Sequence, residues 1–318
     1  MLELKGRGLF VFSDPGGAKP ILSLVLSLRP LLDDFLILSD REYAFFKDFE
    51  LPVLLVKAPP QYYMASFEPD FIFTGTSYTS TIELTYIAEA KARGIKNYAY
   101  IDHWTSIRKR FDNDGSEILP DVVCVIDEKA KHIAIEEGIE ASSIKIVGNP
   151  YHQFLKNWRP TISKGTFFEK LGINAVNKHI VLYAPDPLSN VNGVAVFGFD
   201  EIIATEFISQ ISEQLKDSHC FILKPHPNQN LEKLKESLTE NIILVDRNAD
   251  ANSLIYYADC VVGFFSSFLI EASIMQKQVF RLAIVEMKSD PFKDMAIGEL
   301  VNKKELLSSL NSLKYCGR

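Results

Sequence analysis

Residues 8–17, GLFVFSDPGG, join a continuous apolar run to a loop that contains two glycines. The run over Gly8–Ser13 predicts a buried strand, because a strand that is covered on both faces is apolar at nearly every position. An apolar, helix-like segment follows over 20–32. A buried strand, a tight turn and a helix make up the repeating unit of a parallel α/β sheet, so this stretch favours that fold class.

The same alternation continues through the first half of the chain. Strands are predicted over 35–39, 53–57, 70–74, 97–101, 122–126 and 144–147, and helices over 80–93 and 128–137. The sequence Gly148-Asn149-Pro150 ends this series, because glycine and proline interrupt regular structure. The polar stretch 158–178 is predicted to be a connection.

A second series begins after this connection. Strands are predicted over 179–183, 220–224, 242–245, 260–263 and 278–282, helices over 201–215, 231–238, 251–257 and 267–276, and a polar helical segment from 291 onward. We therefore predict an α/β fold with two Rossmann-like parallel-sheet domains that face each other across a cleft, where ligands often bind. The predicted domains are 1–157 and 179–318 with the linker 158–178, and a return of the last helix to the first domain is left open.

Composition narrows the function. Of the 318 residues, 47% are hydrophobic and 24% are charged, which is typical of a globular protein. The net charge of −7 argues against a nucleic-acid partner, which requires a basic face. Apolar runs stay well short of the roughly 20 residues that span a bilayer, and the N-terminus does not resemble a signal peptide. The four cysteines lack CxxC spacing, and no cluster has metal-ligand spacing, so we predict a cytoplasmic protein without a metal.

Two loops of the first half could bind an anion. Gly16 and Gly17 would let backbone N–H groups approach a ligand at the start of a helix. This loop lacks both GxGxxG and a Lys-Ser/Thr pair, so a tight turn is the alternative reading. Thr76 and Ser77 follow the strand predicted over 70–74, where their hydroxyls could bind an anion or cap the next helix.

A third loop combines a carboxylate with an imidazole. Asp102 and His103 follow the strand predicted over 97–101 and are candidates for a general base. The basic residues Arg108 and Arg110 come shortly after and could receive a phosphate or carboxylate. The alternative for this basic run is an exposed helix face.

Two loops of the second half carry the strongest signals. Lys224-Pro225-His226-Pro227 closes a strand, and the flanking prolines hold the imidazole in a stiff turn. Ser266 and Ser267 end another strand and open a helix. Hydroxyls and free N–H groups at a helix start form a phosphate cradle that needs no metal.

These second-half motifs carry a family resemblance. KPHPN over 224–228 and VVGFFSSFLIEASIMQKQVFRL over 261–282 resemble the donor domain of GT-B glycosyltransferases. The pattern is similar to that of sialyltransferases and Kdo transferases, which use CMP-sugars, and of CDP-glycerol glycerophosphotransferases. The resemblance implies that His226, Ser266 and Ser267 contact the donor phosphate and that Glu271 binds ribose or base. VGNPYHQ over 147–153 also resembles the interdomain segment of GT-B enzymes and of UDP-sugar 2-epimerases.

The first-half loops SDPGGA, TGTS and YIDHW resemble those of polysaccharide-biosynthesis proteins from surface-antigen or flagellin-glycosylation clusters. None of these three loops contains a clear Asp/Glu-Asp/Glu-Gly triplet of the kind found in bacterial sialyltransferases, and the chain lacks the His-Gly of the glycerophosphotransferases. Under the resemblance, the first domain would therefore bind the acceptor and supply the base from Asp102, His103 or Asp14. The second domain would bind the nucleotide donor, with Lys224 as a further phosphate-binding candidate. Gly16 and Gly17 of the first domain are also candidates for binding the donor phosphate.

The resemblance implies a GT-B-like, inverting, metal-independent glycosyltransferase without a cofactor. The favoured reaction moves a nonulosonate or Kdo-type sugar from a CMP-linked donor onto a glycan, lipid-linked glycan or protein acceptor. The alternatives are a CDP-glycerol-type phosphotransferase and a UDP-sugar 2-epimerase or hydrolase. Peripheral contact with the inner face of the inner membrane is left open.

Overall fold

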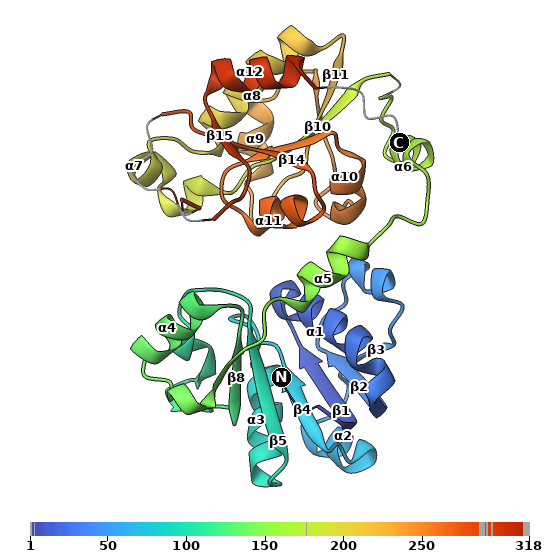
Figure 1. Ribbon diagram of the computed structural model, residues 1–318, viewed down its shortest axis with the longest axis vertical. Coiled ribbons are helices and arrows are strands. Elements are labelled where there is room, and N and C mark those ends of the chain that lie inside the picture. Colours follow the sequence, from blue (N-terminus) through green and yellow to red (C-terminus); the bar gives the residue numbers. More distant parts are fainter. Residues whose placement is uncertain are drawn as a thin grey trace. The chain divides into compact units, whose positions relative to one another are not determined.

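The computed structural model describes residues 2, 4–175, 177–285, 290, 292–293 and 295–313. The chain forms two compact units, Met1–Phe154 and Leu155–Arg318. Each unit is built on one parallel sheet with helices around it (Figure 1). The predicted fold class, two Rossmann-like parallel-sheet domains, is therefore confirmed.

The sheet of the first unit has the strand order β3-β2-β1-β4-β5-β8-β9, and all neighbouring pairs in it are parallel. From β1 the chain first adds β2 and β3 on one side, and it then crosses to add β4 and the later strands on the other side. The carboxyl ends of β1 and β4 are therefore the topological switch point, where ligands bind in such folds. The strands are β1 (Gly6–Phe12), β2 (Leu32–Ser39), β3 (Val53–Leu55), β4 (Phe71–Thr74), β5 (Lys96–Ile101), β8 (Val122–Val125) and β9 (Ile144–Ile146). The helices are α1 (Pro15–Leu28), α2 (Pro60–Phe67), α3 (Ile82–Ala92), α4 (Glu128–Glu136) and α5 (Pro150–Asn157).

Shorter elements complete this unit. A two-stranded antiparallel hairpin lies between β5 and β8. The short elements are η1 (Arg29–Leu31), η2 (Ala44–Phe49), η3 (Arg108–Phe111), η4 (Ala141–Ser143), β6 (Asp112–Asn113) and β7 (Ser116–Glu117). Helix α1 begins at Pro15, five residues before the apolar segment predicted to be helical, because proline suits the first turn and Gly16 and Gly17 continue it.

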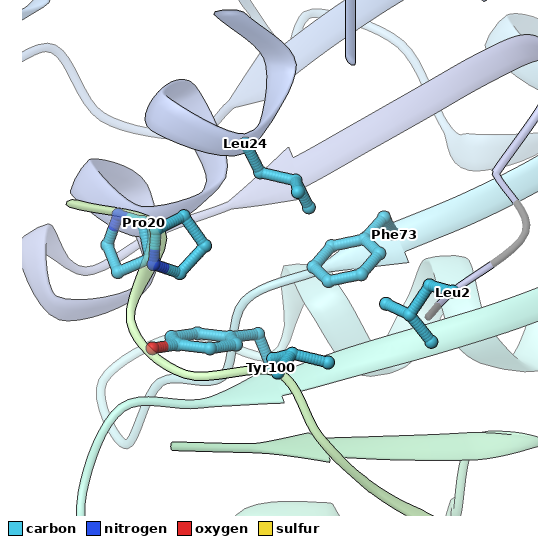
Figure 2. A pocket seen from close by; sticks show the side chains of 7 residues that line it. Leu2, Pro20, Leu24, Phe73 and Tyr100 are labelled. Carbon is cyan, nitrogen blue, oxygen red and sulfur yellow. The ribbon is translucent and has the colours of Figure 1, made fainter. Parts of the chain in front are cut away.

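The apolar run of β1 serves both faces of the first sheet, since successive side chains point in opposite directions. Leu9 and Val11 pack in one core cluster with Tyr86 of α3. On the other face, Phe73 and Tyr100 lie under α1 and line a small apolar cavity of about 40 Å³ (Figure 2). A cavity of this size and lining is a packing defect of the core and not a ligand site.

The sheet of the second unit has the order β12-β11-β10-β13-β14-β15, again all parallel. Its switch point lies between β10 and β13. The strands are β10 (His179–Ala184), β11 (His219–Leu223), β12 (Ile242–Leu244), β13 (Cys260–Gly263), β14 (Gln278–Leu282) and β15 (Glu299–Val301). The helices are α6 (Lys164–Lys170), α7 (Gly193–Phe197), α8 (Glu201–Leu215), α9 (Leu231–Glu236), α10 (Ala251–Tyr257), α11 (Ser267–Ile274) and α12 (Lys303–Asn311), with η5 (Leu188–Val191) before α7.

Helices cover both faces of this sheet. Figure 1 shows α8 and α12 on one side and α10 and α11 on the other. Leu306 and Leu310 of α12 lie in the same core cluster as the β10 residue Tyr183. On the opposite face, Phe167 and Phe168 of α6 pack into the core, so the segment predicted to be a connection contains a helix of the second unit.

The C-terminal segment differs from the prediction. The chain from 291 onward was expected to be helical, but β15 precedes α12 and pairs with β14. A three-residue edge strand with the polar Glu299 has no readable apolar pattern. Pro291 itself lies outside the described residues. None of the described helices is long and apolar enough to cross a bilayer.

Candidate functional site

The carboxyl ends of β1, β4 and β5 bring three of the predicted loops together. The loops after β1 and β4 touch through glycines, because a Cβ on Gly17 would lie 3.1 Å from the Cα of Gly75. A larger residue at either position would force these two loops apart. The switch point of the first sheet is therefore built for close approach of its backbone.

Asp102 lies against the first turn of α1. A Cβ on Gly16 would lie 2.0 Å from the Asp102 Oδ2, so glycine makes room for this carboxylate. The other oxygen, Oδ1, accepts a hydrogen bond of 3.0 Å from Arg110 Nη1, which also donates to Thr76 Oγ1 at 3.1 Å. The guanidinium of Arg110 packs over the Tyr78 ring at 4.6 Å. The structure thus gathers four predicted residues, Gly16, Thr76, Asp102 and Arg110.

Two neighbouring candidates lie outside this cluster. Arg108 donates to both carboxylate oxygens of Glu117, at 2.5 and 3.0 Å, and to the carbonyl oxygen of Glu137. These contacts anchor β7 to the end of α4, and the guanidinium is engaged in this anchoring. His103 is exposed, and its Nδ1 lies 3.0 Å from Thr105 Oγ1.

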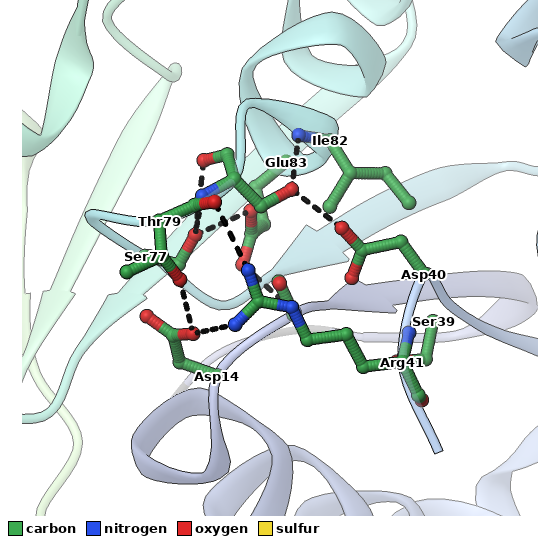
Figure 3. A network of polar contacts seen from close by, with 10 residues as sticks. Asp14, Ser39, Asp40, Arg41, Ser77, Thr79, Ile82 and Glu83 are labelled. Atoms are coloured by element: carbon green, nitrogen blue, oxygen red, sulfur yellow. Dashed lines mark hydrogen bonds and ion pairs between the residues drawn. The ribbon is translucent and has the colours of Figure 1, made fainter. Parts of the chain in front are cut away.

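Sequence reasoning missed a buried carboxyl group in this unit. Glu83, in the first turn of α3, is only 2% exposed. Its Oε1 accepts the Ser13 N–H at 2.9 Å, and its Oε2 lies 3.3 Å from Ser77 Oγ (Figure 3). Burial raises the pKa of Glu83 to about 7; hydrogen bonds from backbone N–H groups oppose this rise, and the charges of Asp14 and Asp40 add to it.

The hydrogen bonds of Ser77 favour the protonated form of Glu83. Ser77 Oγ donates to the Ser80 carbonyl oxygen at 2.9 Å and accepts the Ser80 N–H at 3.2 Å. A hydroxyl has only one hydrogen to donate. A proton on Glu83 Oε2 can be donated to Ser77 Oγ, and every member of this group is then satisfied.

Asp14 is held in an ion pair at the edge of this network. Its Oδ1 accepts from Arg41 Nη1 and from Thr79 Oγ1, both at 2.9 Å (Figure 3). Its backbone carbonyl accepts the first hydrogen bonds of α1. Asp14 therefore orders the loop after β1 and the segment before α3.

In the second unit, strand register brings three loops level at the carboxyl edge. Ala184 of β10 is paired with Gly263 of β13, and the Lys224 N–H donates to the Tyr183 carbonyl oxygen. Two positions beyond Ala184, Lys224 and Gly263, the loops after these strands contain Asp186, His226 and Phe265, respectively. Adjacent strands are about 4.8 Å apart, so this edge gathers the loops on both sides of β10.

The hydrogen bonds of His226 fix its tautomer. Its Nδ1 accepts the backbone N–H of Asn228 at 3.1 Å, so the neutral ring carries its proton on Nε2. The backbone N–H of His226 donates to Gln229 Oε1 at 3.1 Å. Burial lowers the pKa of His226, and the charge of Lys224 adds to this effect. Lys224 donates to the Arg247 carbonyl oxygen at 2.5 Å.

The start of α11 presents donors at the same edge. Ser266 is the N-cap residue, with extended backbone, and its side chain makes no capping hydrogen bond. Its Oγ is buried and has no hydrogen-bond partner of acceptable geometry in the described part of the chain. Ser267 is exposed at the first helical position, and Glu271 lies buried one turn further on. First-turn N–H groups have no partner within their own helix, so they can bind an anion.

Asp186 is a second residue that sequence reasoning missed. It follows β10, between the two loops just described, and its Oδ2 accepts the Phe265 N–H at 3.1 Å. Burial raises the pKa of Asp186 to about 6, while the hydrogen bond from the Phe265 N–H and the proximity of the Ser266 hydroxyl oppose the rise. The sequence signal was an acidic residue at a strand end between Pro185 and Pro187.

Among the residues that the structure describes, no three His, Cys, Asp or Glu side chains gather as metal ligands would. The candidate site of the second unit is therefore made of His226, Ser266, Ser267 and Asp186 around first-turn N–H groups. Its imidazole N–H, hydroxyl and first-turn N–H groups are donors that could bind an anion such as phosphate.

One family model matches part of the chain. Residues 130–283 match the family model of CDP-glycerol:poly(glycerophosphate) glycerophosphotransferase. The matched range includes His226, Ser266, Ser267 and Glu271. No curated protein matches the chain.

Several solved structures share the fold. The UDP-GlcNAc 2-epimerase from Methanocaldococcus jannaschii aligns with a TM-score of 0.65 and 15% identity, over 98% of this chain and 94% of that chain. A putative UDP-N-acetylglucosamine 2-epimerase from Listeria monocytogenes aligns with a TM-score of 0.68 and 16% identity, over 98% and 88%. The enzyme from Neisseria meningitidis bound to UDP-GlcNAc gives 0.62 and 15%, over 96% and 90%. At these identities the likeness establishes a GT-B-like scaffold.

Proposed function

We propose that the chain is a transferase that acts on a nucleotide-linked donor and holds the donor phosphate at the carboxyl edge of the second sheet. The observation that carries this proposal is the register of β10, β11 and β13, which sets the His226 loop and the start of α11 on either side of β10. The match of residues 130–283 to a phosphotransferase family supports the same location.

The donor groups at this edge suit a leaving phosphate. The His226 ring donates from Nε2, because Nδ1 is occupied by the Asn228 N–H. The Ser266 hydroxyl and the first-turn N–H groups of α11 add donors, and the positive end of the helix dipole favours the negative charge. These groups stabilise the charge that develops on the phosphate as it leaves, so we expect no metal requirement.

For the donor we favour a cytidine nucleotide. In the first candidate reaction an acceptor hydroxyl attacks the anomeric carbon of a CMP-linked nonulosonate or Kdo-type sugar in one inverting displacement. In the second, favoured by the family match, the hydroxyl attacks the β-phosphorus of CDP-glycerol. Both reactions release CMP, and in both the charge of the leaving phosphate is held by the same residues.

We assign acceptor binding to the first unit. Arg110 at the switch point of its sheet is suited to an anionic acceptor group, and Thr76, whose hydroxyl donates to the Tyr100 carbonyl oxygen, positions its guanidinium. Of the three candidate bases, Asp102 and Asp14 are engaged with arginines, whereas His103 is exposed. We therefore favour His103 as the base that takes the proton from the acceptor hydroxyl.

The first test is a thermal-shift panel of CMP, CDP, UDP, GDP and ADP, with and without EDTA. A ligand at 100 times its dissociation constant stabilises the fold by about 2.7 kcal/mol, which shifts the melting temperature measurably. We expect a cytidine-selective shift that EDTA does not alter. A uridine-selective shift, with product formed from a UDP-sugar and no acceptor, would instead favour a 2-epimerase or hydrolase.

The His226→Ala variant tests the role of the imidazole. We expect CMP release from the donor to slow by at least about 100-fold with the fold intact, because a positioned donor typically contributes this much. His132→Ala is the matched control, since His132 is exposed on α4 of the first unit. Turnover of His226→Ala equal to that of the control would exclude the proposed role.

A further inference from the structure

Asp186 occupies the centre of the proposed phosphate site. It follows β10, the strand between β11 and β13, and is level with His226 on one side and Phe265 on the other. Its Oδ2 holds the Phe265 N–H, one residue before Ser266. Asp186 thus contacts directly the loop that opens α11.

A carboxylate at this position conflicts with an anionic ligand. Two negative groups within one largely buried site repel each other, and the repulsion favours the protonated form of the carboxyl group. The titratable and charged groups on the elements around Asp186 include Tyr183 of β10, Glu201 of α8, Lys224 and His226 after β11, and Glu271 of α11. The charge of Glu201 already acts against ionisation of Asp186.

Protonation of Asp186 would replace this charge repulsion with a hydrogen bond to the anion. A neutral carboxyl group has one O–H donor and still has acceptor capacity, so Oδ2 can keep the Phe265 N–H. The carboxyl group then adds a donor beside the buried Ser266 hydroxyl, which has no partner of acceptable geometry among the described residues. Both hydroxyl groups could then bind oxygens of the same phosphate.

We propose that Asp186 is a further binding residue of the donor site: it takes up one proton from solvent when the donor phosphate binds, and its neutral carboxyl group donates a hydrogen bond to a phosphate oxygen. This inference rests on the proposed function, because it requires a phosphate at this edge. No covalent bond changes in the step. Donor binding is therefore coupled to pH through a single carboxyl group.

The coupling has a defined direction. Above the pKa of free Asp186, ligand binding takes up a proton, so affinity falls as pH rises, by up to about tenfold per pH unit. The free His226 ring is also neutral in the range from about pH 7 to 8.5, because burial and Lys224 lower its pKa. A bound phosphate favours protonation of either group, so the two contributions are separated by a variant that removes the Asp186 carboxyl group and keeps His226.

The test is isothermal titration calorimetry on the full chain in buffers that differ in ionisation enthalpy. The probes are CDP-glycerol and UDP-N-acetylglucosamine, diphosphate diesters without the second ionisation near about pH 6 of a phosphate monoester. The wild-type chain should take up close to one proton per bound probe. Asp186→Asn, which keeps an acceptor for the Phe265 N–H, should bind with no proton uptake and with an affinity that is flat in pH.

Two further variants complete the design. Asp186→Ala should also lose proton uptake and should bind about tenfold more weakly than Asp186→Asn, because it lacks the hydrogen bond to phosphate. Asp217→Asn is the matched control, since Asp217 is exposed before β11, at the opposite edge of the sheet, and should behave as wild type.

The outcomes separate the two proposals. Binding without proton uptake by the wild-type chain, or undiminished uptake in Asp186→Asn, overturns the role of Asp186 and leaves the transferase assignment standing. If neither probe nor any nucleotide of the panel binds, the proposed function fails, and the role of Asp186 fails with it.

Discussion

Glu83 shows how one buried side chain connects two functional loops of the first unit. Its carboxyl group links Ser13 after β1 with Ser77 after β4, across the switch point of the sheet. Both loops depend on this group because Ser13 and Ser77 are themselves buried. The protonation state of Glu83 therefore bears on the stability of the whole first site.

Stability should depend on pH through Glu83. Its folded-state pKa of about 7 lies above the ordinary value of 4.5, so between these values the folded chain binds more protons than the unfolded chain. The contribution is fully present below about pH 4.5 and is lost as pH rises through about 7, by about 3 kcal/mol at most. Glu83→Gln mimics the neutral acid, so its stability should lack this slope and exceed that of wild type at about pH 8.

Urea unfolding of the first unit across this pH range measures the effect. Glu136→Gln is the control, because Glu136 is exposed on α4. A Glu83→Gln chain with the same pH slope as the control would show that the pKa of Glu83 is the same in the folded and the unfolded chain.

At the residue scale, the sequence drew attention to polar residues at strand ends and overlooked the buried carboxyl groups beside them. His226, Ser266 and Ser267 were recognisable because they follow apolar strands in motifs with few structural alternatives. Glu83 and Asp186 were not, because their significance depends on burial and on partners 70 and 79 residues away in the chain. Neither burial nor such a contact is encoded in the local pattern.

At the scale of elements, the contact between α1 and the end of β4 depends on two glycines. A Cβ on Gly75 would lie 3.2 Å from the Cα of Gly17 and 3.4 Å from the Cβ of Phe12. Backbone and core both oppose the extra methyl group, so neither neighbour can move away at low cost. Helix α1 can sit at its present distance from the sheet only with glycine here.

Gly75→Ala should therefore destabilise the first unit by about 1–3 kcal/mol, the usual cost of overpacking. Gly165→Ala is the matched control, because a Cβ there would have only Ser163 Oγ, at 4.0 Å, within reach. Alanine is the better helix former, so this control in α6 should be neutral or slightly stabilising. Urea denaturation compares both variants with wild type, and equal midpoints for all three would refute the close-approach argument.

Most strands and long helices follow directly from the sequence, since β13, β14, α8 and α10 have the predicted bounds. Two of the elements that the sequence did not predict have little local signal. Helix α6 has only two apolar residues, Phe167 and Phe168, and β15 is too short to show a period. Elements stabilised by one or two contacts with a distant sheet leave little local signal.

At the scale of the whole molecule, the two units have separate sheets and separate cores. The proposed donor site lies within the second unit alone. Ligand binding should therefore stabilise local structure in that unit first, because stabilisation acts on the elements that contact the ligand.

Hydrogen exchange with mass spectrometry checks this expectation. With a nucleotide that binds in the panel, peptides over 224–229 and 264–271 should exchange at least about tenfold more slowly. Peptides over 82–92 in the first unit should change much less. A nucleotide that gives no thermal shift serves as control, and equal protection of both units would place the ligand elsewhere.

The strand order has a consequence for how the chain is made. In each unit the central strand, β1 or β10, leaves the ribosome first, and the sheet then grows toward one side before it turns to the other. Strand β10 ends at Ala184, but its second neighbour β13 begins only at Cys260. During synthesis of the intervening chain one edge of β10 has no partner, which is when a growing parallel sheet is most prone to aggregate. The start of α11 is made later still, so the donor cannot assist the nascent chain before nearly the whole protein has been translated.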